Sequence, residues 1–229
     1  MIPDALLLDA GNTIVFADHA AMAAVLQGCG HAIEARAIRD CQAAANSAYI
    51  ACLEEGAPHE DGWQTLMRTW VCAAGVAEAQ AVDVVRALRT VHDDFNLWRR
   101  VPDDVIDALT RLREASIPLA VVSNSEGGLR ALFERLDLAR FFEVMIDSAE
   151  EGVRKPDPDI FLRACRRLGA EPARCLYAGD LPEVDVDGAR RAGLAAALVD
   201  PLGAYPDYRD APRFASLAEL TDAILNDAL

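Results

Sequence analysis

The feature that most constrains this chain is an apolar run near its start that ends abruptly in a carboxylate. Residues 6–8 are all leucine, and they are followed by Asp9 and then by a turn containing Gly11 and Asn12. Such a run predicts a buried strand that presents Asp9 at its carboxyl tip. In a parallel sheet this edge is where ligands bind and catalytic groups gather.

The same pattern occurs twice more along the chain. Residues 119–122 form an apolar run that leads to Ser123 and Asn124, and residues 175–178 form one that leads to Asp180. Because the carboxyl ends of parallel strands meet at one edge of a sheet, we expect the three polar tips to converge on a single crevice.

Strand and helix patterns alternate strictly from about residue 100 onward. The expected strands cover residues 119–122, 144–146, 175–178 and 195–199, and the expected helices cover residues 105–115, 128–136, 157–168 and 184–192, with a last helix from residue 216. Such alternation with apolar strands is typical of a parallel sheet covered by helices on both faces. The predicted fold class is therefore α/β, with a doubly wound, Rossmann-like parallel sheet.

An alanine-rich helical segment separates the first strand from this alternating region. Breaks at glycine and proline divide the segment into expected helices over residues 20–28, 34–55, 62–74 and 77–96. The predicted organisation is a Rossmann-like catalytic core of residues 1–15 and 100–229, with an inserted α-helical cap, or lid, of residues 16–99.

Charge and composition exclude several classes of function. The 229 residues include 22 basic and 37 acidic side chains, so a nucleic-acid backbone would be repelled. No stretch approaches the apolar length of a membrane span, and we expect no targeting segment. The six cysteines form no close C-x-x-C pair and are expected to be small core residues. We therefore expect a cytoplasmic protein that binds neither nucleic acid nor a membrane.

Three carboxylates, Asp9, Asp180 and Asp185, are expected at the same edge of the sheet. Their repulsion would be strongly unfavourable unless a cation lay among them. Ligand sets made only of oxygen suit Mg²⁺. Taken singly, an aspartate before a helix is more often an N-cap or a solvated loop acid, but taken together the three favour a metal site.

A lysine and two polar residues extend the expected site. Lys155 lies just before a helix start at residues 156–158, where the helix dipole is already positive, which indicates an anion nearby. Ser123 and Asn124 follow an apolar strand, so a hydroxyl and loop amides are available to hold phosphate oxygens. The alternatives are an ordinary surface lysine and a helix cap.

The order of these residues resembles the four motifs of the haloacid dehalogenase superfamily. The motifs are carried by residues 9–13 (Asp-Ala-Gly-Asn-Thr), by Ser123 with Asn124, by Lys155 with Pro156, and by Gly179 with Asp180 and Asp185. Residues 152–161 and 185–193 are similar to the subgroup whose helical cap is inserted after the first motif. The resemblance covers nearly the whole chain, and four ordered motifs are far more specific than any one of them.

The resemblance implies a Mg²⁺-dependent hydrolase in which Asp9 attacks phosphorus to form an aspartyl-phosphate that water then hydrolyses. Ser123 and the Asn124 amide would hold the phosphoryl oxygens. Lys155 would neutralise charge on the nucleophile and on the transferring group. Catalysis by such a site is mainly positioning and electrostatics.

The resemblance also implies the metal ligands. Asp9 and Asp180 would bind Mg²⁺ directly, Asp185 would bind it directly or through water, and the Gly11 carbonyl would complete the protein ligands.

At Gly11 the chain departs from the family's phosphatases, which carry there a second aspartate that protonates the leaving group and later activates water. Dehalogenases and phosphonate-cleaving members of the superfamily also lack that aspartate. Retention of Asp180 and Asp185 argues for a metal, and so against the metal-free dehalogenases. The phosphonate hydrolases use a cap lysine, and residues 17–96 contain no lysine.

The lid and its connections are where the resemblance places substrate choice. The candidate residues are Phe16, Asp18, His19, Tyr49, Trp63, Trp70 and Trp98. Most of the tryptophan and tyrosine residues are expected to pack in the lid core. His19 lies in the irregular connection that follows the first motif and could donate a proton in the crevice; a surface histidine is the alternative.

Three functions are consistent with these observations. The first is a phosphatase acting on a small phosphorylated metabolite, with the lid closing to exclude water and select the substrate. The second is a catalytically weak member that binds a phospholigand or a protein, which the missing carboxylate at Gly11 favours. The third is a hydrolytic dehalogenase, which needs no metal. The oligomeric state stays open.

Overall fold

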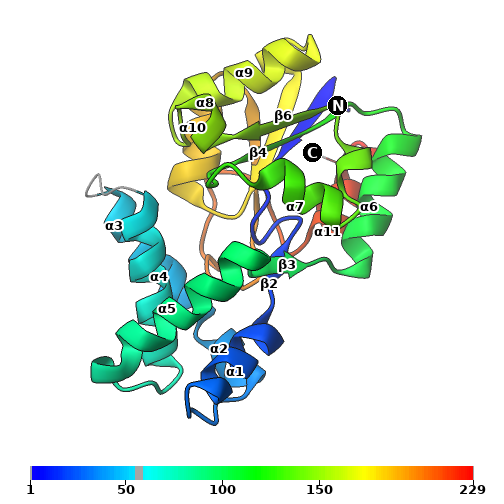
Figure 1. The fold of residues 1–229 in the computed structure, drawn as a ribbon. Coiled ribbons are helices and arrows are strands. Elements are labelled where there is room, and N and C mark those ends of the chain that lie inside the picture. The colour runs from blue at the N-terminus through cyan, green and yellow to red at the C-terminus, as the bar shows by residue number, and fades with distance from the viewer. Residues whose placement is uncertain (1, 55–58, 229) are drawn as a thin grey trace. The chain divides into compact units, whose positions relative to one another are not determined.

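The computed structural model describes residues 2–54 and 59–228. They form two compact units, one made of Met1–Phe16 with Trp98–Leu229 and the other of Ala17–Leu97. The first unit contains the main sheet, and helices α1 to α5 make up the second (Figure 1). A two-stranded sheet of β2 (Phe16–Ala17) and β3 (Trp98–Arg100) lies where the chain passes from one unit to the other.

A six-stranded sheet forms the centre of the first unit, and all its neighbouring strands are parallel. In spatial order the strands are β5 (Val144–Asp147), β4 (Leu119–Ser123), β1 (Ala5–Leu8), β6 (Cys175–Gly179), β7 (Ala195–Val199) and β8 (Arg213–Phe214). The arrangement confirms the predicted α/β class. The edge strand β8 has only two residues and was not predicted, because so short a run carries no readable period.

The central strand β1 positions Asp9. All four residues of β1 are buried. Leu8 is paired with Val121 of β4 and with Ala178 of β6. The N–H of Asp9 continues the ladder by donating to the Ala178 carbonyl at 2.8 Å. Asp9 therefore lies at the carboxyl edge of the sheet, between the tips of β4 and β6.

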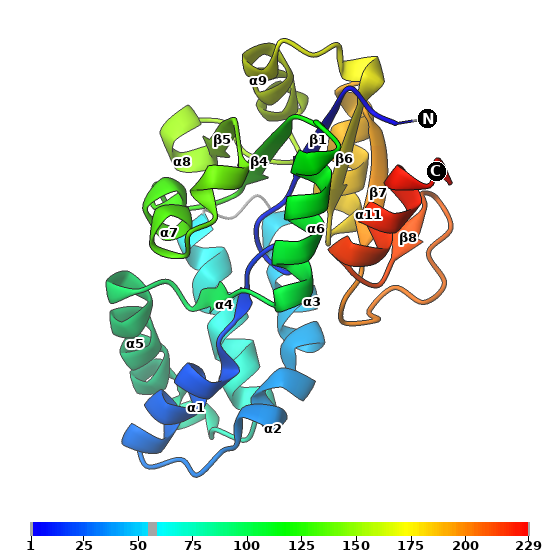
Figure 2. The ribbon, with the colours of Figure 1, turned by 90° about the vertical axis from the view of Figure 1, so that its right-hand side faces the viewer.

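Helices cover both faces of the sheet (Figures 1 and 2). Leu6 and Leu8 belong to one hydrophobic core and Leu7 to the other, which is the two-residue period of a strand. The first core includes side chains of α6 (Asp103–Glu114), α7 (Leu129–Arg135) and α11 (Leu217–Leu225), and the second includes side chains of α9 (Pro158–Leu168) and α10 (Asp187–Arg191).

Short turns complete this unit. They are α8 (Ser148–Glu151), the 3-10 turns η1 (Ala139–Phe141) and η2 (Pro172–Arg174), and a π-helical turn, η3 (Pro182–Val186). The helix predicted over residues 184–192 is wrong at its start, because η3 precedes α10. The wider turn accompanies the inward-facing Asp185, whose Oδ2 accepts the Leu181 N–H at 3.0 Å. Single π-helical turns are frequent at functional sites.

The second unit contains α1 (His19–Gly28), α2 (Ala35–Asp40), α3 (Gln42–Glu54), α4 (His59–Ala73) and α5 (Glu78–Asp94). The single helix predicted over residues 34–55 is wrong. In a continuous helix the Ile38 carbonyl would accept the Gln42 N–H, but here it accepts the Trp70 indole N–H at 2.6 Å and the Cys41 N–H at 3.2 Å. A contact from α4 ends α2. The predicted break at residues 56–58 lies outside the described residues.

Burial of the aromatic and sulfur-containing residues differs from one position to the next. Trp70 and Trp63 are buried in the helical unit, as core residues. Among the cysteines, Cys165 and Cys175 are buried, whereas Cys29 is exposed and the other three are half-buried. The prediction that the cysteines are core residues is therefore wrong for most of them, because amphipathic helices also place small residues at the edge of their apolar stripe.

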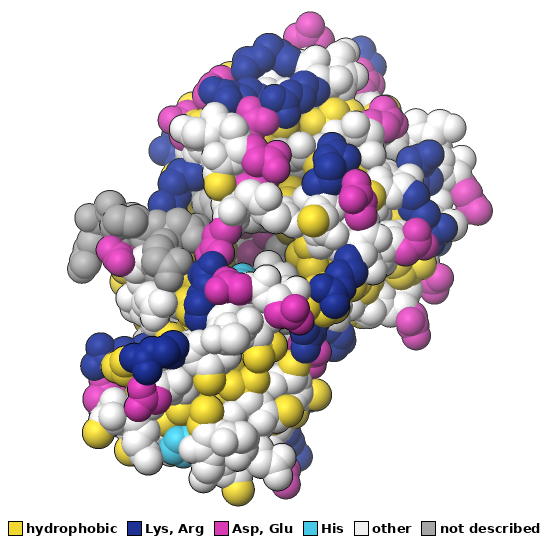
Figure 3. All heavy atoms as spheres, in the orientation of Figure 1, with side chains coloured by type: hydrophobic (Ala, Val, Ile, Leu, Met, Phe, Trp, Pro, Cys, Tyr) yellow, Lys and Arg dark blue, Asp and Glu magenta, His cyan; other side chains and the backbone are white. Residues whose placement is uncertain are grey.

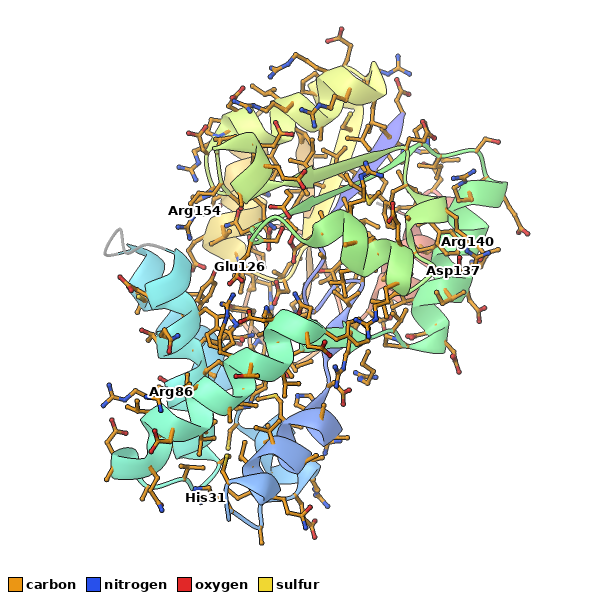
Figure 4. All side chains as sticks on the ribbon, in the orientation of Figure 1. His31, Arg86, Glu126, Asp137, Arg140 and Arg154 are labelled. Carbon is orange, nitrogen blue, oxygen red and sulfur yellow. The ribbon has the colours of Figure 1, made fainter. Side chains whose placement is uncertain are left out.

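Charged side chains of both signs are interspersed on the face shown in Figure 3. One exposed pair, Asp137 and Arg140, lies side by side in Figure 4, with the carboxylate 3.1 Å from the guanidinium. None of the helices in the described ranges is long and apolar enough to cross a membrane.

We predict that Gly188→Ala destabilises the fold. A Cβ on Gly188 would lie 2.8 Å from Phe161 Cε2 and 3.1 Å from Pro156 Cα. Such overpacking should lower the free energy of unfolding by about 1–3 kcal/mol. At Gly128, the N-cap of α7, φ is −112° and no atom lies within 4 Å of an added Cβ, so alanine should lower it only by the difference between glycine and alanine at an N-cap, less than about 1 kcal/mol. Equal urea midpoints for the two variants would contradict this packing.

Candidate active site

One buried cation is shared by two aspartates at the carboxyl edge of the sheet. The Lys155 ammonium donates to Asp9 Oδ1 at 2.5 Å and to Asp185 Oδ1 at 2.7 Å. Lys155 is 3% exposed and is the only lysine in the sequence. Asp9 follows β1, Lys155 lies in the loop before α9, and Asp185 lies in η3. Three segments distant in sequence therefore meet at one nitrogen.

A third carboxylate, Asp180, completes the cluster. It directly follows β6, and one oxygen from each of Asp9, Asp180 and Asp185 lies within 4.8 Å of the others. The side chain of Asn12 donates to Asp180 Oδ2 at 2.9 Å. All three aspartates are buried. The structure thus brings together the three acids that the sequence placed at this edge.

The cluster holds more negative charge than Lys155 can balance. Burial raises the pKa of Asp9 to about 6, even though Lys155 acts to lower it. Burial, and then repulsion by Asp9 and Asp185, raises the pKa of Asp180 well above its usual range. Burial acts to lower the pKa of Lys155, but the carboxylates of Asp185 and Asp9 outweigh it and raise that pKa. The charge of the lysine is fully balanced, whereas the combined charge of the three carboxylates is not.

This imbalance fits a divalent cation. Three carboxylates lie together with a single ammonium, and all the candidate ligand atoms are oxygens, which suits Mg²⁺. A bound cation would favour the ionised form of each acid and remove the repulsion that raises the pKa of Asp180. The donor set therefore fits the metal that the sequence predicts.

Close packing at Gly179 lets Asp185 reach this position. A Cβ on Gly179 would lie 2.4 Å from Asp185 Cγ, a distance that no side chain can tolerate. Gly179 ends β6 and immediately precedes Asp180. The Gly-Asp pair therefore supplies one acid directly and makes room for a second.

The loop after β4 is tied to Lys155 through its backbone. Ser123 ends β4 and is buried. The side chain of Asn124 donates to the Lys155 carbonyl at 2.9 Å and accepts the Lys155 N–H at 2.8 Å. Asp147 fixes the same loop by accepting the N–H groups of Gly127 and Leu129. The Asn124 side chain thus holds the lysine-bearing loop.

His19 belongs to the helical unit. It is the first residue of α1, where its Nε2 lies 3.0 Å from Gln42 Oε1 and its ring is edge-on to Trp70. The preceding Asp18 caps the same helix by accepting the Ala21 N–H at 2.9 Å. Both side chains therefore make structural contacts in α1 and its neighbours. A role for His19 as proton donor stays a prediction.

Sequence reasoning missed two residues of the cluster, Asn12 and Tyr177. The Tyr177 hydroxyl contacts Lys155 and Asp185, each at 2.9 Å. Burial raises the pKa of Tyr177 well above its usual range, so the hydroxyl stays protonated. A tyrosine in an apolar strand is indistinguishable from a core aromatic residue by pattern alone. The only signal was a hydroxyl three residues before Asp180.

A family model described as haloacid dehalogenase-like hydrolase matches residues 3–193. The chain belongs to this family. The chain is 32% identical over 180 residues to haloacid dehalogenase-like hydrolase domain-containing protein 3 of Homo sapiens, and this match covers 75% of the chain and 70% of that protein. It is 36% identical over 128 residues to glyceraldehyde 3-phosphate phosphatase of Methanopyrus kandleri. That second match covers 54% of the chain and only 53% of the phosphatase, about half of its length.

Solved structures agree with this fold. The structure has a TM-score of 0.72, at 20% identity, to the putative HAD-hydrolase YfnB from Bacillus subtilis bound to magnesium, covering 98% of this chain and 100% of that one. Its TM-score to L-2-haloacid dehalogenase from Xanthobacter autotrophicus is 0.62, at 22% identity, covering 98% and 99%. Likeness at this level of identity establishes the shared fold.

We predict that Asn124→Ala lowers the free energy of unfolding by roughly 1–3 kcal/mol, because the Lys155 N–H and carbonyl both lose a partner in a half-buried place. The matched control is Arg130→Ala on the exposed surface of α7, which should change it by less than about 0.5 kcal/mol. Urea unfolding measures both. If Asn124→Ala were as stable as the control, the Asn124 contacts would not matter for the loop.

Proposed function

We propose that this hydrolase is a Mg²⁺-dependent phosphatase that acts on a small phosphorylated metabolite through an aspartyl-phosphate on Asp9. The observation that carries the proposal is the buried set of three carboxylates around one lysine, at a strand tip. Phosphatase names among the relatives, including glyceraldehyde 3-phosphate phosphatase and phosphoserine phosphatase, support this reaction class. The helical unit is proposed to be the cap that selects the substrate.

In the proposed first step Asp9 attacks phosphorus. Because Lys155 holds Oδ1 of Asp9, the attacking atom would be Oδ2. A bond forms between that oxygen and phosphorus, the ester P–O bond breaks, and the leaving oxygen keeps the electron pair of that bond and takes a proton from solvent water to give the alcohol. The Ser123 hydroxyl and the backbone N–H of Asn124 would hold the phosphoryl oxygens, since the Asn124 side chain is engaged with Lys155.

In the second step water attacks the aspartyl-phosphate, releases inorganic phosphate and restores the Asp9 carboxylate. Asp9, Asp180 and the Gly11 carbonyl would hold Mg²⁺, with Asp185 binding it directly or through water. The cation would supply positive charge that stabilises the transferring group. Lys155 would stabilise the same charge from the side of Asp9.

The absence of a carboxylate at position 11 favours one competing function, a catalytically weak member that binds a phospholigand or a protein. The other alternative, a metal-free dehalogenase, gives no reason to bury Asp180 beside Asp9 and Asp185. Both alternatives make different predictions for turnover and for metal dependence.

The test compares p-nitrophenyl phosphate with 2-chloropropionate, each with and without Mg²⁺. We expect Mg²⁺-dependent release of phosphate only, and a loss on the order of 10³-fold or more in Asp9→Asn. Mg²⁺ should raise the Tm of the parent, and Asp180→Ala should abolish that rise. Metal-independent release of chloride would indicate a dehalogenase. Metal binding without turnover would indicate a binding protein.

We further predict a steep dependence of kcat on the leaving group. General acid catalysis contributes roughly 10²- to 10⁴-fold, and Gly11 offers no side chain for it. An alkyl phosphate needs that proton far more than an aryl or acyl phosphate does. Rates for sugar phosphates should therefore be low unless Asp18 or His19 acts as the acid.

The matching variant is Gly11→Asp, which should restore part of the rate toward alkyl phosphates. Glycine is not required here by conformation, since the left-handed residue in this turn is Asn12, with a φ of 54°. An added Cβ would lie 3.7 Å from the Trp98 indole, an ordinary contact. Equal parental rates on alkyl and aryl esters, unchanged in His19→Ala, would mean that another acid is present.

A further inference from the structure

Tyr177 lies at the centre of the charged cluster, although it belongs to a buried strand. It is the third residue of β6, is fully buried, and is paired in register with Leu7 of β1. Its ring packs at 82° against Phe161 of α9, with centroids 4.8 Å apart. The ring is thus an ordinary member of the core between the sheet and α9.

The hydroxyl of Tyr177 has a different environment. It accepts a hydrogen bond from Lys155 Nζ at 2.9 Å and donates one to Asp185 Oδ1 at 2.9 Å. The Val122 carbonyl lies 3.4 Å away as a longer alternative acceptor. The hydroxyl therefore connects the Lys155 ammonium with the Asp185 carboxylate, two oppositely charged groups of the site.

This contact completes the coordination of the lysine. An ammonium has three N–H donors, and Lys155 directs them to Asp9, Asp185 and Tyr177. Two of these acceptors are charged and one is neutral. Three fixed acceptors leave the ammonium with one orientation, and the same hydroxyl fixes one oxygen of Asp185.

Packing does not explain the oxygen. Phenylalanine would fill the same space against Phe161, and burying a hydroxyl is unfavourable unless its hydrogen bonds are made. Nearby Tyr208 packs against the same core, yet its buried hydroxyl has no hydrogen-bond partner among the described residues. The two tyrosines therefore differ in the hydrogen bonds of their hydroxyl groups. Removal of the Tyr208 hydroxyl is thus a matched control for removal of the Tyr177 hydroxyl.

We propose that Tyr177 is a positioning residue for the reaction, which fixes the Lys155 ammonium between Asp9 and Asp185 and holds Asp185 in place. This inference rests on the proposed function. Tyr177 acts through Lys155 and Asp185 and does not touch the substrate. A preset ammonium stabilises the developing charge without reorganising during the reaction.

The test compares Tyr177→Phe with Tyr208→Phe. Tyr177→Phe should lower kcat for p-nitrophenyl phosphate about 10- to 100-fold, as is usual for the loss of a residue that orients a catalytic group. The KM should change less than about twofold, because the phosphoryl-binding loop is untouched. Tyr208→Phe should leave kcat and KM unchanged. A kcat for Tyr177→Phe within about twofold of the parent would overturn the proposal.

A second readout does not depend on turnover. Because Lys155 is the only lysine, protein labelled with ¹⁵N-lysine gives a single side-chain ammonium signal. Tyr177→Phe should shift that signal and speed its proton exchange, and Tyr208→Phe should not. A signal that is the same in all three proteins would overturn the proposal. An unreactive parent whose signal responds only to Tyr177→Phe would instead overturn the phosphatase function and leave the Tyr177 contact with Lys155 established.

Discussion

The site depends on one buried ammonium, whose positive charge lies beside the negative charges of three carboxylates. Burying Lys155 is favourable only because Asp9 and Asp185 accept hydrogen bonds from its ammonium. Burying Asp180 is unfavourable, because its carboxylate lies beside those of Asp9 and Asp185. The folded chain thus carries unbalanced negative charge in a place that water scarcely reaches. Such a cluster of buried charges contributes little to the stability of the fold. It strongly favours binding of a further positive charge, and a metal-dependent hydrolase requires a site with that property.

The parallel sheet makes this arrangement possible. Side-by-side registry of β4, β1 and β6 brings their carboxyl ends to one edge, and the hydrophobic cores on both faces keep that registry from slipping. The loops that follow are held by side chains to backbone groups: Asn124 binds the peptide of Lys155, and Asp147 binds the loop after β4. The positions of Asp9 and Asp180 therefore come from strands, that of Asp185 comes from η3, and that of Lys155 comes from a hydrogen-bonded loop.

Much of this could be predicted from sequence because the controlling signals are local. An apolar run that ends in Asp9 or Asp180 predicts both a strand and the position of its carboxyl end. The order of the motifs identified the family. The rest depended on contacts that no local window contains. The helix break at Cys41 is caused by the Trp70 indole from another helix. The Asn124 side-chain amide binds the backbone of Lys155. The role of the Tyr177 hydroxyl can be recognised only when Lys155 and Asp185 are seen beside it.

The interrupted course of the sheet unit has a consequence for how the chain is made. β1 precedes both of its neighbours in the chain, which begin only at Leu119 and Cys175, after the whole contiguous segment Ala17–Leu97 has been added. During synthesis β1 therefore has no strand to pair with until β4 has been added. The helical segment is by then already complete. Pairing between such distant segments is a slow step in folding. Asp9 is thus added long before Asp185, and the buried cluster around Lys155 can assemble only after Asp185 has followed.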